Sequence, residues 1–298
     1  MKIVLLGKNG QVGHELQRTL LPLGQVIALG REEADLSVLT QLQGVLAQHT
    51  PDIIVNAAAY SAVDKAESDE ATAFCINAEA VGLMAEHARQ SGALLVHYST
   101  DYVFDGENPA PYVETDATNP QSAYGRSKRA GEQAIEQSGC RALIFRTSWV
   151  FSVHGSNFIK TILRLAKERE NLNVVADQYG APTSAALVAD VTAQLVRQKQ
   201  REGGENFPFG LYHLVPGGET NWCSYARFVV SEALAVGKPL KLSPDSICAI
   251  TSSEYPTPAK RPANSRLDTS KLRGLFGLEL PNWQSGVRHI LQQILGES

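Results

Sequence analysis

Residues 2–13, KIVLLGKNGQVG, pass directly from a short apolar run into a glycine-rich loop. An apolar run of this length is typical of a strand that is buried on both faces of a parallel sheet. The glycines would let the backbone turn tightly and bring a phosphate close to the free N–H groups at the start of the next helix. This order of strand, loop and helix predicts a dinucleotide-binding loop, whose cofactor-binding residues would be Gly7, Asn9, Gly10, Gln11, Val12 and Gly13. The alternative is a glycine-rich turn without a ligand.

The same kind of apolar run recurs through the first half of the chain, at residues 26–29, 53–56, 93–99 and 142–148. Helical patterns lie between these runs; Val12, Leu16 and Leu20, for example, follow one another at four-residue spacing. Strands that alternate with helices predict an α/β fold, a doubly wound parallel sheet of the Rossmann-like type with right-handed crossovers.

The pattern changes after about residue 150, where prolines interrupt shorter elements. We therefore expect a dinucleotide-binding domain over residues 1–150. Residues 151–298 should form mainly a smaller C-terminal substrate-binding lobe that is interleaved with the sheet.

The composition excludes several classes of protein. The formal net charge of −4 gives no electrostatic footprint for nucleic acid. No apolar stretch approaches the roughly 20 residues of a membrane-spanning helix, and the apolar run at the N-terminus is too short for a signal peptide. The four cysteines include no C-x-x-C pair, and the seven histidines form no ligand pattern, so no metal site is predicted. We expect a cytoplasmic protein that binds neither nucleic acid nor membrane.

Tyr124 and Lys128 stand at positions i and i+4, on one face of a helix if a helix begins here. A lysine ammonium near a tyrosine would stabilise the phenolate and draw its pKa from about 10 toward neutrality. A Y-x-x-x-K pattern also arises by chance. However, Thr100 follows the apolar run at 93–99, at the sheet edge where ligands bind, and could donate a hydrogen bond to a substrate carbonyl. Tyr98 shares its side of that strand. Thr100, Tyr124 and Lys128 together predict a catalytic centre, and we expect Tyr98, Tyr124 and Lys128 to bind the cofactor.

The second apolar run ends at Gly30-Arg31 and is followed by Glu32-Glu33. NAD-specific folds often carry an acid at this point to bind the ribose hydroxyls, whereas an arginine can pair with a 2′-phosphate. Arg31 therefore favours NADPH over NADH as the cofactor. The alternative is that Arg31 is a solvated surface cation, and NADH stays open.

Seven segments together resemble the dTDP-4-dehydrorhamnose reductase family, within the extended short-chain dehydrogenases, and the resemblance covers essentially the whole chain. These segments are 7–13, 56–67 (NAAAY and VDKAE), 99–104 (STDYVF), 124–128 (YGRSK), 145–150 (FRTSWV), 177–183 (DQYGAPT) and 261–265 (RPANS). The first and fourth are shared widely among short-chain dehydrogenases. The combined set is specific to this family.

The resemblance implies NADPH-dependent reduction of the C4 keto group of dTDP-4-dehydro-L-rhamnose in dTDP-rhamnose and polysaccharide biosynthesis. It implies that Thr100, Tyr124 and Lys128 form the catalytic triad. It also implies that Asp35, Leu36, Ala59, Tyr60 and Ser61 lie along the cofactor, and that the substrate side is lined by Asp101, Phe104, Trp149, Asn157 and Arg261. A homodimer is expected, because some members of the family are described as metal-linked dimers. A divalent metal such as Mg²⁺ at a subunit interface stays open, although no ligand cluster in the sequence supports it.

Two alternatives compete with the reductase. The first is a nucleotide-sugar dehydratase or epimerase of the same fold. Related dehydratases carry Thr-Asp-Glu where this chain has Thr100-Asp101-Tyr102, and the missing glutamate favours simple reduction. The second is a non-catalytic, cofactor-binding regulatory subunit, against which the intact Thr100, Tyr124 and Lys128 argue.

Overall fold

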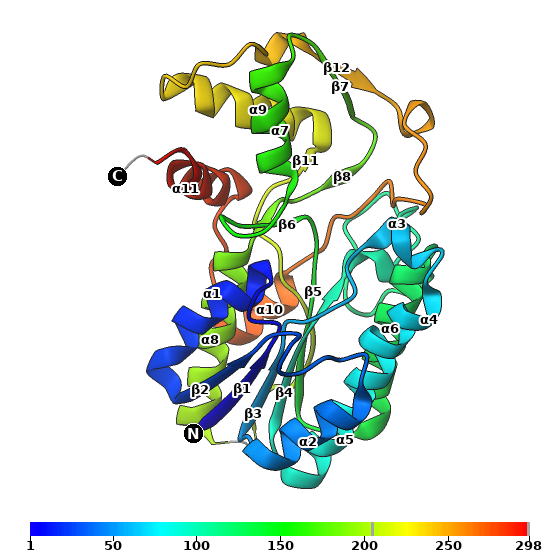
Figure 1. The fold of residues 1–298 in the computed structure, drawn as a ribbon, viewed down its shortest axis with the longest axis vertical. Helices are drawn as coiled ribbons and strands as arrows, with labels where there is room; N and C mark the ends of the chain where they lie inside the picture. The colour runs from blue at the N-terminus through cyan, green and yellow to red at the C-terminus, as the bar shows by residue number, and fades with distance from the viewer. Residues whose placement is uncertain (204–205, 297–298) are drawn as a thin grey trace.

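A parallel sheet of six strands forms the centre of one half of the molecule, seen in the lower part of Figure 1. The computed structural model describes residues 1–203 and 206–296. The strands run in the order β10-β5-β4-β3-β1-β2, and each neighbouring pair is parallel. Their bounds are β1 Lys2–Leu6, β2 Gln25–Leu29, β3 Ile53–Asn56, β4 Leu94–Thr100, β5 Ala142–Thr147 and β10 Gly210–His213. The predicted doubly wound α/β fold is confirmed.

Helices cover both faces of this sheet because the strands are apolar on both sides. One core contains side chains of α1 (Gln11–Leu20), α8 (Ala185–Glu202) and α10 (Ser270–Phe276), packed on one face of the strands. The opposite core contains side chains of α2 (Leu39–His49), α5 (Ala80–Ser91) and α6 (Ala123–Ser138). Figure 1 shows α1 and α8 on one side of the strands and α5 and α6 on the other.

Strand β10 is the one strand of this sheet that the sequence patterns did not indicate. It is short, and prolines stand nearby on both sides at Pro208 and Pro216, which resembles a loop more than a strand. Its pairing with β5 at the edge of the sheet places it there. Residues beyond 150 therefore contribute α8, β10 and α10 to the sheet half.

Strand β1 lies at the point where the chain direction across the sheet reverses, because β2 follows on one side of it and β3 on the other. The carboxyl ends of parallel strands meet at one edge, and ligands bind there in sheets of this type. The loops that leave β1, β3 and β4, together with the start of α6, are the loops that carry the predicted motifs.

A second core lies apart from the sheet, in the upper part of Figure 1. It is built by α7 (Phe158–Glu168), α9 (Trp222–Ala235) and α11 (Trp283–Leu295), with the parallel pair β7 (Leu172–Val175) and β12 (Ile247–Ile250). Two short pairs lie in the connecting segments, β6 (Val150–Phe151) with β9 (Thr183–Ser184), and β8 (Tyr179–Gly180) with β11 (Thr220–Asn221). We call the part of the chain around this core the lobe.

The remaining helical elements are short turns between these parts. They are η1 (Leu21–Leu23), α3 (Val63–Ala66), α4 (Glu70–Phe74), the π-helical turn η2 (Cys75–Glu79), η3 (Asp101–Val103), η4 (Pro244–Ser246) and η5 (Ser252–Glu254). Within the described residues, no helix has the length and apolar character needed to cross a membrane.

Candidate active site

The loop after β1 approaches the neighbouring backbone so closely that only glycine fits. Gly7 has a φ of +85°, and a Cβ there would lie 2.7 Å from the nitrogen of Ala58. A Cβ on Gly13 would lie 2.0 Å from the carbonyl oxygen of Gly7. Helix α1 begins directly after Gly10, and no side chain caps its first N–H groups. The loop and helix end therefore form a cradle of the kind that binds a pyrophosphate.

Arg31 lies just beyond β2, with its side chain 78% exposed. Its Nε donates to Asp35 Oδ2 at 3.0 Å. The Asp35 carboxylate also accepts two bonds from Ser37, and these bonds, followed by Arg31, lower the pKa of Asp35. Lys8 forms an ion pair with Glu33 at the same end of β2, a cation that sequence reasoning did not single out. Leu36 is buried in the core on the α2 face of the sheet.

The segment after β3 contains Ala59, Tyr60 and Ser61. An asparagine that the sequence did not indicate binds its backbone. Asn77 is 1% exposed and belongs to the π-helical turn η2. Its Oδ1 accepts from Tyr60 N at 2.9 Å, and its Nδ2 donates to Tyr60 O at 3.1 Å. The same Nδ2 also lies 3.0 Å from Ser127 Oγ on α6. No motif could have indicated Asn77, because its contacts come from tertiary packing.

Tyr124 and Lys128 lie in the first two turns of α6, as their spacing predicts. The helix starts after Ser122, whose Oγ accepts from Gly125 N at 3.1 Å. Lys128 is 1% exposed. Its Nζ donates to the carbonyl oxygen of Tyr98 at 2.6 Å and lies 3.2 Å from His97 Nε2. Burial lowers the pKa of Lys128 to about 8, against the opposing effect of the nearby Glu132 carboxylate.

The pKa of Tyr124 is raised, the opposite direction to the sequence expectation. Burial is the largest cause, and the hydrogen bond with Thr100 acts against it. The lysine does not produce the expected lowering, because its amine contacts strand β4 instead. The ring of Tyr102 lies edge-on to that of Tyr124, with 5.6 Å between centroids. The phenol of Tyr124 therefore stays protonated near neutral pH.

Thr100 and Asp101 are buried side by side at the carboxyl end of β4. Thr100 Oγ1 donates to Asp101 Oδ1 at 2.9 Å and accepts from Tyr102 N at 3.2 Å. Asp101 is 2% exposed, and its Oδ2 has no partner within the described part of the chain. Burial raises the pKa of Asp101 to about 6. Thr100 thus lies beside both Tyr124 and a carboxyl group that changes protonation state near neutral pH.

Two of the predicted site residues have side chains in cores. The Tyr98 ring packs in the core on the α8 face of the sheet, where its hydroxyl lies 2.8 Å from Thr192 Oγ1. Only its backbone carbonyl reaches the site, as the acceptor for Lys128. Phe104 is 1% exposed and stacks on Tyr112, with 4.1 Å between ring centroids. Its ring belongs to a small core and does not line the substrate side, because the Tyr112 ring covers it.

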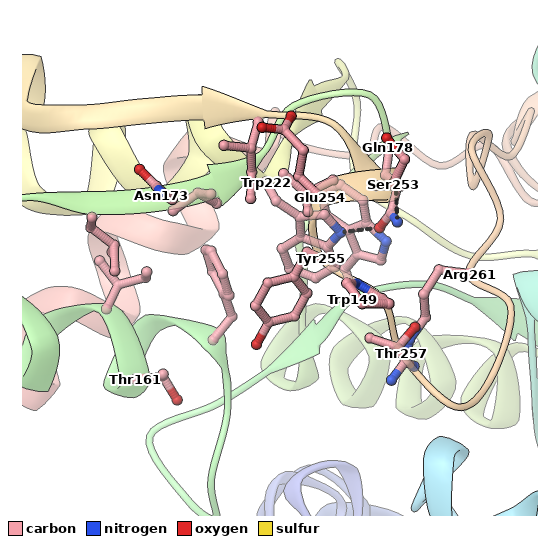
Figure 2. A pocket seen from close by; sticks show the side chains of 18 of the residues that line it. Trp149, Thr161, Asn173, Gln178, Trp222, Ser253, Glu254, Tyr255, Thr257 and Arg261 are labelled. Carbon is pink, nitrogen blue, oxygen red and sulfur yellow. Dashed lines mark hydrogen bonds between the residues drawn. The ribbon is translucent and has the colours of Figure 1, made fainter.

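A cavity of about 1200 Å³ lies beside this cluster and extends into the lobe. Its lining residues include Tyr102. They also include Trp149, Trp222, Tyr255 and Arg261, which Figure 2 labels. Trp149 stacks on Trp222 with 3.7 Å between ring centroids, and Trp222 Nε1 donates to Gln178 Oε1 at 3.1 Å. The φ of Trp149 is +49°, a conformation that costs energy for a bulky side chain. One part of the cavity wall is therefore a stacked pair of indoles, which is fixed by the hydrogen bond of Trp222.

Arg261 and Asn157 connect the lobe segments to the sheet half. Arg261 donates to the Tyr102 hydroxyl at 3.0 Å and to Asp64 Oδ2 at 2.6 Å. Asn157 caps α7, and its Nδ2 donates to Gln11 Oε1 at 3.0 Å. Asn157 thus lies against the glycine-rich loop rather than in the cavity wall, a placement that the sequence did not indicate.

Comparisons with known proteins cover nearly the whole chain. Residues 1–295 match the family model described as the RmlD substrate binding domain. The dTDP-4-dehydrorhamnose reductase of Burkholderia thailandensis is 48% identical over 298 residues, which cover 100% of both chains. That of Escherichia coli is 49% identical, over 99% of this chain and 98% of the relative. The chain belongs to the dTDP-4-dehydrorhamnose reductase family.

A solved member of this family has the same fold. It is the dTDP-4-dehydrorhamnose reductase of Bacillus anthracis in complex with NADP, with a TM-score of 0.88 and 33% identity, covering 98% of this chain and 99% of that one. The predicted family and the prediction of a reductase are confirmed. Among the residues that the structure describes, no group of three His, Cys, Asp or Glu side chains is placed to hold a metal ion. A metal at a subunit interface stays untested.

Proposed function

We propose that this enzyme reduces the C4 keto group of dTDP-4-dehydro-L-rhamnose to give dTDP-L-rhamnose, the last step of dTDP-rhamnose biosynthesis, with NADPH as reductant. One observation carries the proposal. Tyr124 lies beside Thr100 at the carboxyl edge of the sheet, Lys128 bonds to the backbone of β4 nearby, and the ring of Tyr102 connects Tyr124 to the cavity wall. A reductase of a large substrate needs this adjacency of cofactor cradle, proton donor and cavity.

The cradle fits a dinucleotide, because Gly7 and Gly13 leave no room for a side chain where the backbone turns. We propose that residues 7–13 hold the pyrophosphate, that Arg31 and Asp35 lie at the adenosine end, and that residues 59–61 lie along the rest of the cofactor. When bound, NADPH supplies the hydride. The chain's own part is to orient it against the substrate carbonyl.

Tyr124 is the proposed general acid. Its raised pKa keeps the phenol protonated near neutral pH, so that it can give a proton to the oxygen of the carbonyl being reduced. Thr100 Oγ1 donates to Asp101 here, and a rotated hydroxyl would point the same hydrogen at the substrate carbonyl. Lys128 is proposed to hold the ribose hydroxyls.

The cavity is the proposed site of the dTDP-sugar. The stacked indoles of Trp149 and Trp222 offer an apolar wall, and Arg261 is the cation at the end nearest Tyr102. Residues 1–150 would then mainly bind the cofactor and residues 151–298 mainly the substrate. The cytoplasmic location and the homodimer are proposals that rest on the free cysteines and on the family resemblance.

The test is the stoichiometry of NADPH oxidation. With dTDP-4-dehydro-L-rhamnose, one NADPH should be consumed per sugar reduced, and none without the sugar. A dehydratase recycles its cofactor, so water loss from dTDP-glucose without net cofactor consumption would contradict the reductase. NADPH binding without any turnover would instead favour the regulatory subunit.

A further inference from the structure

A chain of four hydrogen-bond contacts runs from the loop after β3 to Lys128; the first is partly buried and the other three are buried. Ala58 N donates to Asn56 Oδ1 at 3.2 Å, and Asn56 Nδ2 lies 3.2 Å from His97 Nδ1. His97 Nε2 lies 3.2 Å from Lys128 Nζ, which in turn donates to Tyr98 O at 2.6 Å. Asn56, His97 and Lys128 are each at most 1% exposed. These three side chains therefore bond mainly to one another and to neighbouring backbone groups.

The direction of each hydrogen bond in this chain follows from its first member. A backbone N–H can only donate, so the Asn56 atom facing Ala58 must be the carbonyl oxygen. The Asn56 amide nitrogen then faces His97 and donates to Nδ1. A neutral imidazole that accepts at Nδ1 carries its proton on Nε2. His97 consequently presents an N–H, not a lone pair, to the amine of Lys128.

An N–H that faces Nζ distinguishes the two forms of the lysine. A neutral amine has one lone pair, with which it can accept from His97 Nε2 while it donates to Tyr98 O. An ammonium has none, so two donors would face each other. To remove this contact between two donors, His97 would have to adopt its other tautomer and the Asn56 amide would have to turn. The turned amide would lose its hydrogen bond to Ala58 N.

We propose that His97 is a positioning residue that favours the neutral amine of Lys128, and that Asn56 sets the tautomer in which it does so. Two observations agree. Burial lowers the pKa of His97 well below its ordinary value, so the imidazole is neutral, and burial lowers the pKa of Lys128 to about 8. Glu132 on α6 acts in the opposite direction, with its charge shared by Arg146 on β5 and by Arg129.

The consequence is that the charge of Lys128, one helical turn from Tyr124, changes near pH 8. Any effect of this change on catalysis rests on the role proposed above for Lys128. The protonation equilibrium of Lys128 does not depend on that role. The equilibrium is also coupled to the loop after β3, because the same Asn56 amide holds the backbone of Ala58.

The first experiment is NMR of the intact enzyme. The ¹⁵N shifts of the His97 ring report its tautomer directly. We expect a protonated Nε2 and an unprotonated Nδ1 at a pH above the Lys128 transition. A protonated Nδ1 at that pH would overturn the proposal, whether or not any variant folds and whatever the enzyme reduces.

The second experiment is a titration of Lys128 by its ¹³Cε shift, with the signal assigned by its loss in Lys128→Met. In His97→Gln, the side-chain amide can turn its oxygen toward Nζ and accept from the ammonium, so the transition should move upward by about one pH unit or more. The pH profile of single-turnover NADPH oxidation should move in parallel.

Thr192→Val is the matched control. It removes a buried hydrogen bond on the other face of β4, to the Tyr98 hydroxyl, without touching Lys128. It should lower stability and leave the Lys128 transition unchanged. The role of His97 would be overturned if Lys128 titrated at the same pH in His97→Gln as in the unaltered enzyme. It would also be overturned if Thr192→Val moved the Lys128 transition as far as His97→Gln does.

Discussion

The sheet half and the lobe build their parts of the site in different ways. In the sheet half, each functional group comes from one short segment, such as residues 7–13 or residues 124–128. In the lobe, the cavity wall joins Trp149, Gln178, Trp222 and Arg261, which are far apart in the sequence. The first kind of site follows from local geometry, namely a turn or one helix face. The second exists only after the chain has folded.

This difference should also divide the kinetic roles. If groups at the carboxyl edge of the sheet act on the reacting atoms, as proposed, their loss should lower kcat. If groups in the cavity wall hold a part of the substrate that does not react, their loss should raise KM. Substitutions in the two regions would sharpen this division, or break it if both parameters respond alike.

The largest effect is expected from Tyr124→Phe, which removes the proposed proton donor and keeps the ring. The chemical step should slow by roughly 100-fold or more, the size of a lost general acid, while NADPH binding survives. Single-turnover rates and cofactor titrations measure the two quantities. Tyr102→Phe is the matched control, because it removes the hydroxyl of the adjacent ring. Near-normal turnover in Tyr124→Phe, or an equal loss in both variants, would place the proton donor elsewhere.

A smaller effect, and of the other kind, is expected from Trp222→Ala. This change removes the stacking partner of Trp149 and the hydrogen bond to Gln178. KM for the sugar nucleotide should rise by about 10-fold, in line with about 1.4 kcal/mol for an aromatic contact, while the dissociation constant of NADPH stays constant.

Trp222→Phe is a smaller change, because it keeps a stacking ring. Its KM for the sugar nucleotide should lie between those of the unaltered enzyme and Trp222→Ala. Steady-state kinetics at saturating NADPH would measure both variants, with thermal unfolding as the check on folding. A fall in kcat at constant KM would show that the cavity wall acts on the chemistry, and the division between the regions would fail.

The limits of the sequence prediction follow the same boundary. The strands β1 to β5, the glycine loop and the position of Tyr124 on a helix could be predicted, because each depends on a pattern within a few residues. Asn77 and the Gln11–Asn157 contact could not, because tertiary packing alone brings these residues to their partners. The direction of the Tyr124 pKa shift was predicted wrongly, since spacing indicates that Lys128 is near but not where its amine bonds.

The smallest effect is expected from Arg31→Ala, at the adenosine end of the sheet half. If Arg31 pairs with a 2′-phosphate, KM should rise for NADPH and stay constant for NADH. The rise should be modest, roughly 5-fold, because the side chain is 78% exposed and already shares its charge with Asp35.

Arg18→Ala is the control for net charge, since Arg18 is also an exposed arginine and pairs with Asp190 on α8. It should change neither constant. If Arg31→Ala altered both cofactors equally, or neither, Arg31 would be only a surface cation. The choice between NADPH and NADH would then fall to another group at the end of β2. Lys8 of the glycine-rich loop, which pairs with Glu33 there, would be the next cation to test.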